Sequence, residues 1–137
     1  MNLSSAILAT LSYHDFFDYP LESSEICDLL IKKKAGKILI ERELKRLRAM
    51  GKISESDRYF FLKNRKKIAR IRKLRTKYSQ GKLKRAVFFA SLLKIIPSVK
   101  LVAVSGALSM RNSRRSDDID LVIVTSKGLL WTTRFLA

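Results

Sequence analysis

The sequence predicts an α+β protein made of a helical module with a hairpin, a basic helical connector and the start of an α/β domain. Three observations predict this order. Apolar residues recur at helical spacing through much of residues 3–96, two short β-prone runs lie within residues 52–62, and two further β-prone runs, 99–105 and 121–125, flank a polar loop. We place the domain boundaries at residues 1–62, 63–97 and 98–137.

The composition favours a folded, strongly basic protein. The 137 residues are 47% hydrophobic, which is enough to bury a core. There are 29 Lys and Arg residues against 12 Asp and Glu, so the net charge is +17 and acidic macromolecules are the first partners to consider. Most of the excess lies in residues 32–100, which hold 24 basic and 4 acidic residues, whereas residues 1–31 hold five acidic and no basic ones.

The same composition excludes several classes of protein. One cysteine and one histidine exclude a disulfide framework, and they exclude a Cys/His zinc site supplied by this chain alone. No apolar run approaches the roughly 20 residues that a transmembrane helix needs. The first ten residues contain no basic residue, which a secretory signal would have. We therefore expect the protein in a reducing cytoplasm.

The N-terminal stretch predicts three helices and a hairpin. Helices are expected over residues 3–13, from Ser23 or Ser24 to about residue 33, and up to Gly51, with Leu39, Leu44 and Leu47 facing inward in the third. Residues 52–54 and 58–62 then form the hairpin. Three helices followed by a hairpin is the order of a winged helix, whose third helix occupies the recognition position.

This order makes nucleic-acid binding a candidate function. The candidate residues are Arg42, Lys45 and Arg46 on the third helix, and Lys66, Lys67 and Arg70 just after the hairpin. The alternative is an interaction or spacer module whose charged faces are merely solvated. Two isolated residues nearby are expected to be structural: Cys27 as a buried, inert thiol and His14 as a structural or exposed side chain.

The connector is expected to be a helix with a break. Ile68, Ile71, Leu74 and Tyr78 predict a narrow apolar stripe over residues 63–79. Gly81 predicts a kink or the start of a new helix, and the more apolar helix that follows ends at Pro97. Residues 63–85 contain 12 bases and no acid, which suits a surface that follows phosphates. The alternatives are a solvated connector, or a helix lying on an anionic membrane. The absence of Trp and Phe from the stripe argues against the membrane.

Two carboxylates carry the chemical argument. Asp118 and Asp120 directly precede the β-prone run 121–125, and on a strand alternate residues share a face. Two carboxylates on one face repel each other, and a divalent cation that prefers oxygen ligands, Mg²⁺ or Mn²⁺, would relieve this repulsion. The alternative is that Asp117 and Asp118 are loop or cap residues and that Asp120 sits at a wet strand end.

The surrounding motif resembles that of a known family. Val104-Ser105-Gly106-Ala107, followed after ten residues by Asp118-Ile119-Asp120-Leu121, is similar to the signature of the DNA polymerase beta-like nucleotidyltransferase superfamily. The full order also resembles prokaryotic nucleotidyltransferase-domain proteins with a winged-helix-like start. The resemblance implies that Asp118 and Asp120 are catalytic residues holding Mg²⁺ or Mn²⁺. It implies that Ser105, Gly106 and Ser109 contact a nucleoside triphosphate whose nucleotidyl group goes to a hydroxyl acceptor.

The motif also departs from the family pattern. Ala107 stands where many members have serine, and no acid follows Asp120 although the family takes a third carboxylate from a later strand. Residues 128–137 have the pattern of a helix in progress, in which Trp131 is expected to be a core anchor. We therefore expect a C-terminally incomplete chain that is inactive by itself. There are two competing hypotheses: a non-catalytic nucleic-acid-binding protein, and a truncated or degenerate family member that only makes protein contacts. The acceptor, the nucleotide and the oligomeric state stay open.

Overall fold

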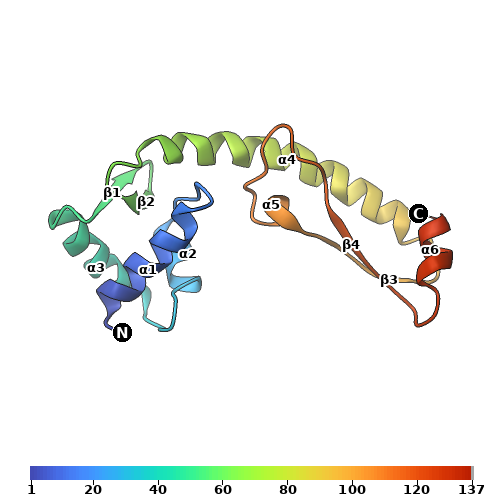
Figure 1. Cartoon of the computed structure of the whole chain (residues 1–137), viewed down its shortest axis with the longest axis horizontal. Coiled ribbons are helices and arrows are strands. Elements are labelled where there is room, and N and C mark those ends of the chain that lie inside the picture. The colour runs from blue at the N-terminus through green and yellow to red at the C-terminus, as the bar shows by residue number, and fades with distance from the viewer. Residues whose placement is uncertain (137) are drawn as a thin grey trace. The chain divides into compact units, whose positions relative to one another are not determined.

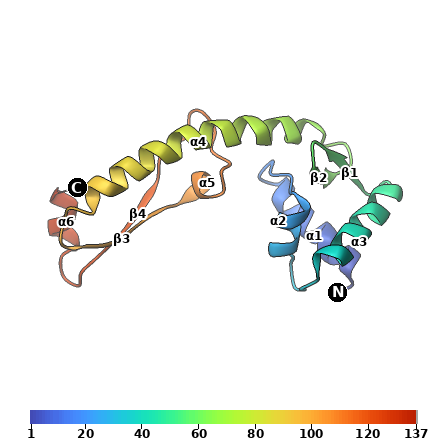
Figure 2. The same cartoon turned by 180° about the vertical axis from the view of Figure 1, so that it is seen from behind.

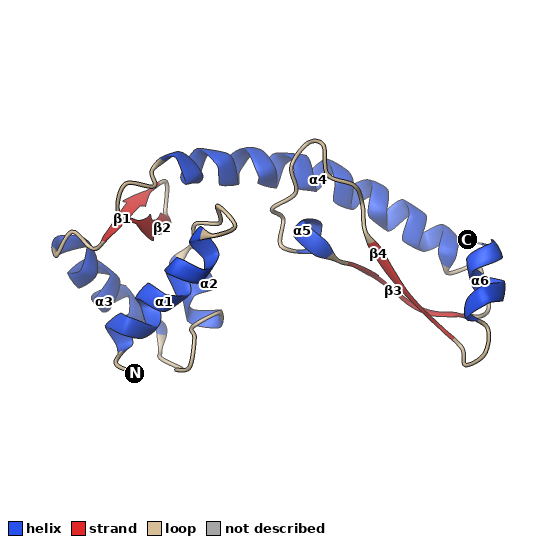
Figure 3. Ribbon diagram, viewed as in Figure 1, coloured by secondary structure: helices blue, strands red, loops and turns tan. Residues whose placement is uncertain are grey.

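The computed structural model describes residues 1–136, with side chains through residue 135. It contains helices and two small antiparallel sheets, which confirms the α+β class (Figure 3). The chain forms two compact units, Met1–Lys73 and Leu74–Ala137. The elements are α1 (Leu3–Asp15), α2 (Ser23–Asp28), α3 (Lys37–Ala49), β1 (Ile53–Ser56), β2 (Tyr59–Leu62), α4 (Lys67–Leu93), β3 (Val99–Val104), α5 (Gly106–Ser109), β4 (Leu121–Thr125) and α6 (Leu130–Leu136), in the order of Figure 1.

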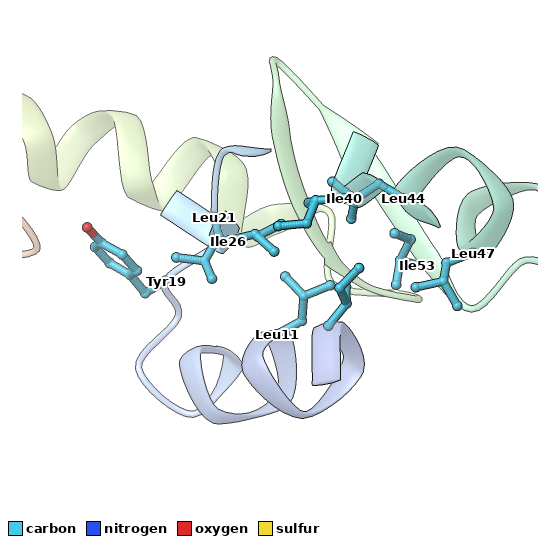
Figure 4. Close-up of a cluster of buried hydrophobic side chains, with 9 residues drawn as sticks. Leu11, Tyr19, Leu21, Ile26, Ile40, Leu44, Leu47 and Ile53 are labelled. Carbon is cyan, nitrogen blue, oxygen red and sulfur yellow. The ribbon is translucent and has the colours of Figure 1, made fainter. Parts of the chain in front are cut away.

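The N-terminal unit packs three helices against the β1–β2 hairpin. Its core consists of Ile7, Leu11, Tyr19, Leu21, Ile26, Ile40, Leu44, Leu47 and Ile53 (Figure 4). β1 and β2 are antiparallel, with Ile53 opposite Leu62. Leu21 joins the same sheet as an isolated bridge, because its N–H donates to the Phe60 carbonyl at 3.1 Å and the Phe60 N–H donates back at 2.7 Å. A third extended segment therefore ties the region between α1 and α2 to the hairpin.

Two helix predictions in this unit are wrong in detail. In α3 the buried residue of the first turn is Ile40, whereas Leu39 is 45% exposed. Ile40, Leu44 and Leu47 follow the i, i+4, i+7 spacing of one helix face, which Leu39 does not share. In α2 the N-cap is Glu22, whose main-chain N–H donates to Glu25 Oε2 at 2.9 Å. A glutamate pair thus replaces the expected serine cap.

The isolated cysteine and histidine have structural contacts. The Sγ of Cys27 donates to the Ala35 carbonyl at 3.4 Å, and the thiol is partly buried. His14 is buried, and its Nδ1 lies 2.8 Å from the Thr10 carbonyl oxygen one helical turn earlier. Both residues therefore help to hold the helices of this unit.

The acidic start of the chain pairs with the first bases after the hairpin. Arg65 donates to Asp15 at 2.9 Å and to Asp18 at 2.7 Å. These hydrogen bonds raise the pKa of Arg65 above its ordinary value, the bond to Asp15 contributing most. The uneven charge of the sequence is thus partly neutralised inside the N-terminal unit.

A second pairing involves a buried arginine on α4. Arg72 donates to Glu25 Oε1 at 2.7 Å, and its guanidinium carbon lies 3.4 Å from the centre of the Tyr19 ring. The Arg72 side chain is only 7% exposed. Burial raises the pKa of Glu25 above its ordinary value. Such a cation, stacked on an aromatic ring and paired with a carboxylate, contributes to the core of the unit rather than to its surface.

Helix α4 runs without a break through Gly81, which Figure 2 shows from behind, so the predicted start of a new helix there is wrong. A helix-interior glycine costs about 1 kcal/mol relative to alanine, and the strong helix formers on both sides outweigh this. The predicted stripe is only partly correct: Ile68 is buried and Ile71 is partly buried, but Leu74 and Tyr78 are 45% and 37% exposed. The buried face instead comprises Ile68, Arg72, Arg75, Ser79, Lys82 and Ala86.

The C-terminal unit contains the antiparallel pair β3–β4, with Val104 opposite Leu121. Leu101 on β3 and Val122 and Val124 on β4 are each about half exposed. Trp131 in α6 is 74% exposed, so it is not the predicted core anchor. Among the described residues, none of the helices has both the length and the apolar character needed to cross a membrane.

Candidate functional site

The end of the β3–β4 pair brings the two halves of the predicted motif together. Beyond the last strand pair, the Ser105 N–H donates to the Asp120 carbonyl at 3.0 Å. Because antiparallel neighbours run in opposite directions, the carboxyl end of β3 meets the amino end of β4. Ser105 and Gly106 therefore lie beside Asp120, although fourteen positions separate Gly106 from it in the sequence.

Gly106 is required by the carboxylate beside it. A Cβ on Gly106 would lie 3.0 Å from Asp120 Oδ2, and the backbone has a φ of +63°, which side chains rarely adopt. A larger residue would thus meet both conformational strain and the carboxylate. The absent side chain leaves room for Asp120 at this end of the sheet.

The two predicted serines lie on either side of Gly106 in α5. Ser105 is the N-cap of this short helix, and its side chain forms no capping hydrogen bond. Ser109 is exposed, and its Oγ donates to the Gly106 carbonyl at 2.7 Å. The Ser109 hydroxyl is therefore engaged within its own helical turn.

Asp118 and Asp120 precede the strand instead of lying on it. β4 begins at Leu121, so the alternation of a strand does not extend to Asp118. Both carboxylates are exposed, and Ile119 between them is half-buried. The neighbouring Asp117 has a different role, since its Oδ2 accepts the Arg114 N–H at 2.7 Å and closes the preceding turn.

Asp118 and Asp120 differ from most acidic residues of the chain because they form no ion pair within the described residues. In residues 15–57, every acid except Asp28 forms an ion pair with a Lys or Arg. Within the part of the chain that the structure describes, Asp118 and Asp120 form none. In a protein of net charge +17, two carboxylates two positions apart in the sequence and without a basic partner leave their oxygens available for an external cation.

Buried polar residues of α4 hold the loop that leads to Asp118. Arg75 Nη1 donates to Asn112 Oδ1 at 3.2 Å, and the Ser113 N–H donates to Ser79 Oγ at 3.1 Å. Lys82, only 5% exposed, donates to Ser113 Oγ at 2.9 Å. It also donates to the main-chain carbonyls of residues 114 and 117. The loop is thus fixed by three buried side chains of α4.

The sequence prediction missed this anchoring. Lys82 and Arg75 fall within the 12 bases that we expected to face phosphates, but the structure buries both and uses them inside the protein. A signal was present: Arg72, Arg75, Ser79 and Lys82 repeat at three or four residues, which is the spacing of one helix face. Because most residues of this buried face are polar, the spacing of the apolar residues alone does not reveal it.

The donor set suits a hard divalent cation that brings further ligands with it. Nowhere among the described residues do three or more His, Cys, Asp or Glu side chains gather in a way that could hold a metal. Asp118 and Asp120 offer carboxylate oxygens only, and Mg²⁺ is commonly held by one or two carboxylates together with water and substrate phosphates. The residues present therefore fit a shared metal–phosphate site better than a closed metal cage.

The predicted nucleic-acid contacts are all on the surface of the N-terminal unit. Arg42, Lys45, Lys66, Lys67 and Arg70 are exposed, and within the described residues they form no ion pair. Arg46 is also exposed but pairs with Glu43 at 3.5 Å.

A hollow of about 370 Å³ lies beside α3, and it is of mixed charge. Lys45, Arg48 and Arg58 line it together with Glu41 and Glu55. Because the two carboxylates offset the three cations, this hollow by itself is poorly suited to a polyanion.

Comparison of the chain with protein-family models, with characterised proteins and with solved structures finds no match to any of them.

Proposed function

We propose that the C-terminal unit carries the metal- and nucleotide-binding part of a nucleotidyltransferase. In this proposal Asp118 and Asp120 hold Mg²⁺ or Mn²⁺ together with the phosphates of a nucleoside triphosphate. The observation that supports it best is the apposition of Gly106 and Asp120, whose Oδ2 lies 3.0 Å from the position of a Gly106 Cβ. The two halves of the resembling motif thus meet at one end of the sheet.

Each residue of this region has a role in the proposed reaction. Asp118 and Asp120 supply carboxylate oxygens, and Gly106 leaves space beside them for the carboxylate and an incoming phosphate. Ser109 and Ser105 flank that space. Lys82, through Ser113, keeps the loop before Asp118 in place. The bound metal would neutralise the phosphates as the acceptor oxygen bonds to the α-phosphorus and pyrophosphate leaves.

The loop before the carboxylates also favours an anionic substrate. Arg114 and Arg115 are exposed, and neither side chain forms an ion pair within the described residues. A nucleoside triphosphate carries several negative charges, so nearby guanidinium groups raise its local concentration. The acid pair and the basic loop thus suit the metal and the phosphates, respectively.

The test measures the binding of Mn²⁺ and nucleoside triphosphates to the whole chain. The electron paramagnetic resonance signal of free Mn²⁺ reports how much of the metal stays unbound. Asp118→Asn and Asp120→Asn are each expected to weaken the Mn²⁺–nucleotide complex by about tenfold or more, since each removes a ligand. Asp28→Asn is the matched control, because Asp28 is also exposed and also outside the ion pairs. Equal binding by all four proteins would refute the proposal.

A second candidate function is non-catalytic nucleic-acid binding by a winged-helix-like N-terminal unit. It is supported by the Leu21–Phe60 bridge, which adds a third extended segment to the hairpin. Arg42 and Lys45 on α3, with Lys66, Lys67 and Arg70, would contact phosphates. The double variant Arg42→Gln, Lys45→Gln is then expected to lower affinity for duplex DNA and to flatten its salt dependence. An unchanged salt dependence would exclude this surface.

A further inference from the structure

A cationic hollow in the C-terminal unit is not explained by either proposed function. It has a volume of about 460 Å³ and is lined by Lys77, Gln80, Gly81, Leu83, Lys84 and Arg111. No acid lines it. Lys77, Lys84 and Arg111 are exposed, and among the described residues none of them is in an ion pair. Three positive charges therefore surround one hollow with no negative charge of the protein to offset them.

The two walls of the hollow are held in a fixed relation. One wall is α4, and the other is Arg111 in the loop after α5. The next two residues along that loop are bonded to the buried face of α4, Asn112 to Arg75 at 3.2 Å and Ser113 to Ser79 at 3.1 Å. Arg111 itself has a φ of +53°, which a non-glycine residue keeps only when its surroundings enforce it. The guanidinium thus projects from a constrained backbone position.

Gly81 has no structural reason to be a glycine. It lies inside α4, where glycine is less favourable than every residue except proline. Its φ is not in the left-handed region, and a Cβ built on it meets no atom within 4 Å. It does, however, line the hollow. A larger residue would occupy that space, so the glycine keeps the hollow open at the expense of helix stability.

We propose that this hollow binds adjacent phosphate groups of a polyanion, either a nucleic-acid strand or a free polyphosphate. Lys77 and Lys84 are separated by seven residues, about 10 Å along the helix axis, so they reach more than one phosphate. The Arg111 guanidinium presents a planar fork that suits two phosphate oxygens. Neither Asp118 nor Asp120 lines the hollow, and the inference does not depend on the proposed metal site.

The test uses the whole chain, without divalent metal, and two probes: a fluorescein-labelled oligothymidylate and inorganic tripolyphosphate as competitor. Lys77→Gln, Lys84→Gln and Arg111→Gln are each expected to weaken binding by about fivefold. Each is also expected to reduce the slope of log affinity against log salt by about 0.7, the value for one phosphate contact on a single strand. Lys100→Gln is the control, because Lys100 is exposed on β3, outside the hollow, and loses the same charge.

Gly81→Leu tests whether the shape of the hollow matters in addition to its charge, because it fills the hollow and removes no positive charge. It is expected to raise the melting temperature, because leucine favours the helix, and to weaken binding at an unchanged salt slope, because it fills the hollow. The affinities of the two probes are compared at equal phosphate concentration. Tighter binding of the oligonucleotide would identify a nucleic-acid strand as the ligand, and tighter binding of tripolyphosphate would identify a polyphosphate. The inference is overturned if Lys100→Gln weakens binding as much as the other charge variants, if Gly81→Leu binds like the wild type, or if neither probe binds.

Discussion

The ammonium of Lys82 lies 2.9 Å from Ser113 Oγ in the interior of the C-terminal unit, where both residues are buried. The other acceptors of this ammonium are main-chain carbonyls, so no carboxylate neutralises the charge. A buried cation is tolerated only when hydrogen bonds replace the water it has lost. Lys82 therefore ties the loop before Asp118 to α4 with all of its donors.

Replacing Lys82 with methionine tests this anchoring. Lys82→Met keeps most of the side-chain volume but removes the ammonium that donates to Ser113 Oγ and to the carbonyls of residues 114 and 117, which is expected to destabilise the unit by about 1–3 kcal/mol. If the nucleotidyltransferase proposal holds, Mn²⁺–nucleotide affinity also falls, because Asp118 loses its support. Urea denaturation followed by circular dichroism measures the stability. Lys84→Met, two residues away and exposed, is expected to stay within about 0.5 kcal/mol of the wild type. Equal effects of the two variants would contradict the anchoring role.

The contact between Gly106 and Asp120 predicts non-additive substitutions. Gly106→Ala is expected to destabilise the protein by about 1–2 kcal/mol through its positive φ, and further through the clash with the carboxylate. In an Asp120→Ala background the clash is absent, so the same substitution costs less, by about 0.5 kcal/mol or more. Gly128→Ala is the control, since Gly128 has a φ of +80° but no atom near a new Cβ. Strict additivity of the double-mutant cycle would show that the contact has no energetic role.

Arg72 is predicted to be the most sensitive base of α4 in the N-terminal unit. Arg72→Met removes the partner of the half-buried Glu25 and the cation above the Tyr19 ring, which is expected to cost about 2–4 kcal/mol. Arg70→Met, on an exposed side of the helix, is expected to change stability by less than about 0.5 kcal/mol. The melting temperatures of the two variants are measured by thermal unfolding, and that of Arg72→Met is expected to be the lower. Similar melting temperatures would argue against a core role for Arg72.

The Asp57–Lys73 pair predicts an acid-dependent contribution to stability. The hydrogen bond from Lys73, 2.8 Å away, holds the pKa of Asp57 below its ordinary value of 3.8. A carboxylate whose pKa is lower in the folded protein stabilises the fold above its unfolded pKa, and this contribution is lost as the pH falls through the folded pKa. The window therefore lies at and below pH 3.8.

Asp57→Asn is expected to remove the pH dependence of stability that comes from the Asp57–Lys73 pair and to leave the rest of the pH dependence unchanged. Urea midpoints measured at neutral pH and below pH 3.8 test this, with Asp28→Asn as the unpaired control. The difference in urea midpoint between the wild type and Asp57→Asn should become smaller as the pH falls. It should also become smaller in high salt, because salt screens exposed ion pairs. A difference that stays constant across the range would contradict the role of the pair.

Much of the secondary structure was predictable because periodicity is a local property. The three N-terminal helices, the hairpin and the two strands around Gly106 all follow from spacing and turn residues. The errors occurred where three-dimensional packing decided between similar patterns. Ile40 replaced Leu39 in the core, and α4 buried Arg72, Ser79 and Lys82 in place of Leu74 and Tyr78.

The sequence motif brought two residues of the candidate site to attention, but it did not predict what surrounds them. The motif identified Gly106 and Asp120, and the structure brings them into contact. The sequence did not reveal that β4 starts only at Leu121, because a strand boundary depends on which backbone groups find partners. It also did not reveal Lys82 and Ser113, since their pairing joins positions 31 residues apart.

The exposed position of Trp131 makes it a natural optical probe. It is the only tryptophan, and with 74% of its surface open to water its fluorescence emission should resemble that of the free indole. Unfolding of the N-terminal unit should therefore leave the emission maximum almost unchanged, whereas any molecule that covers α6 should shift it to shorter wavelength.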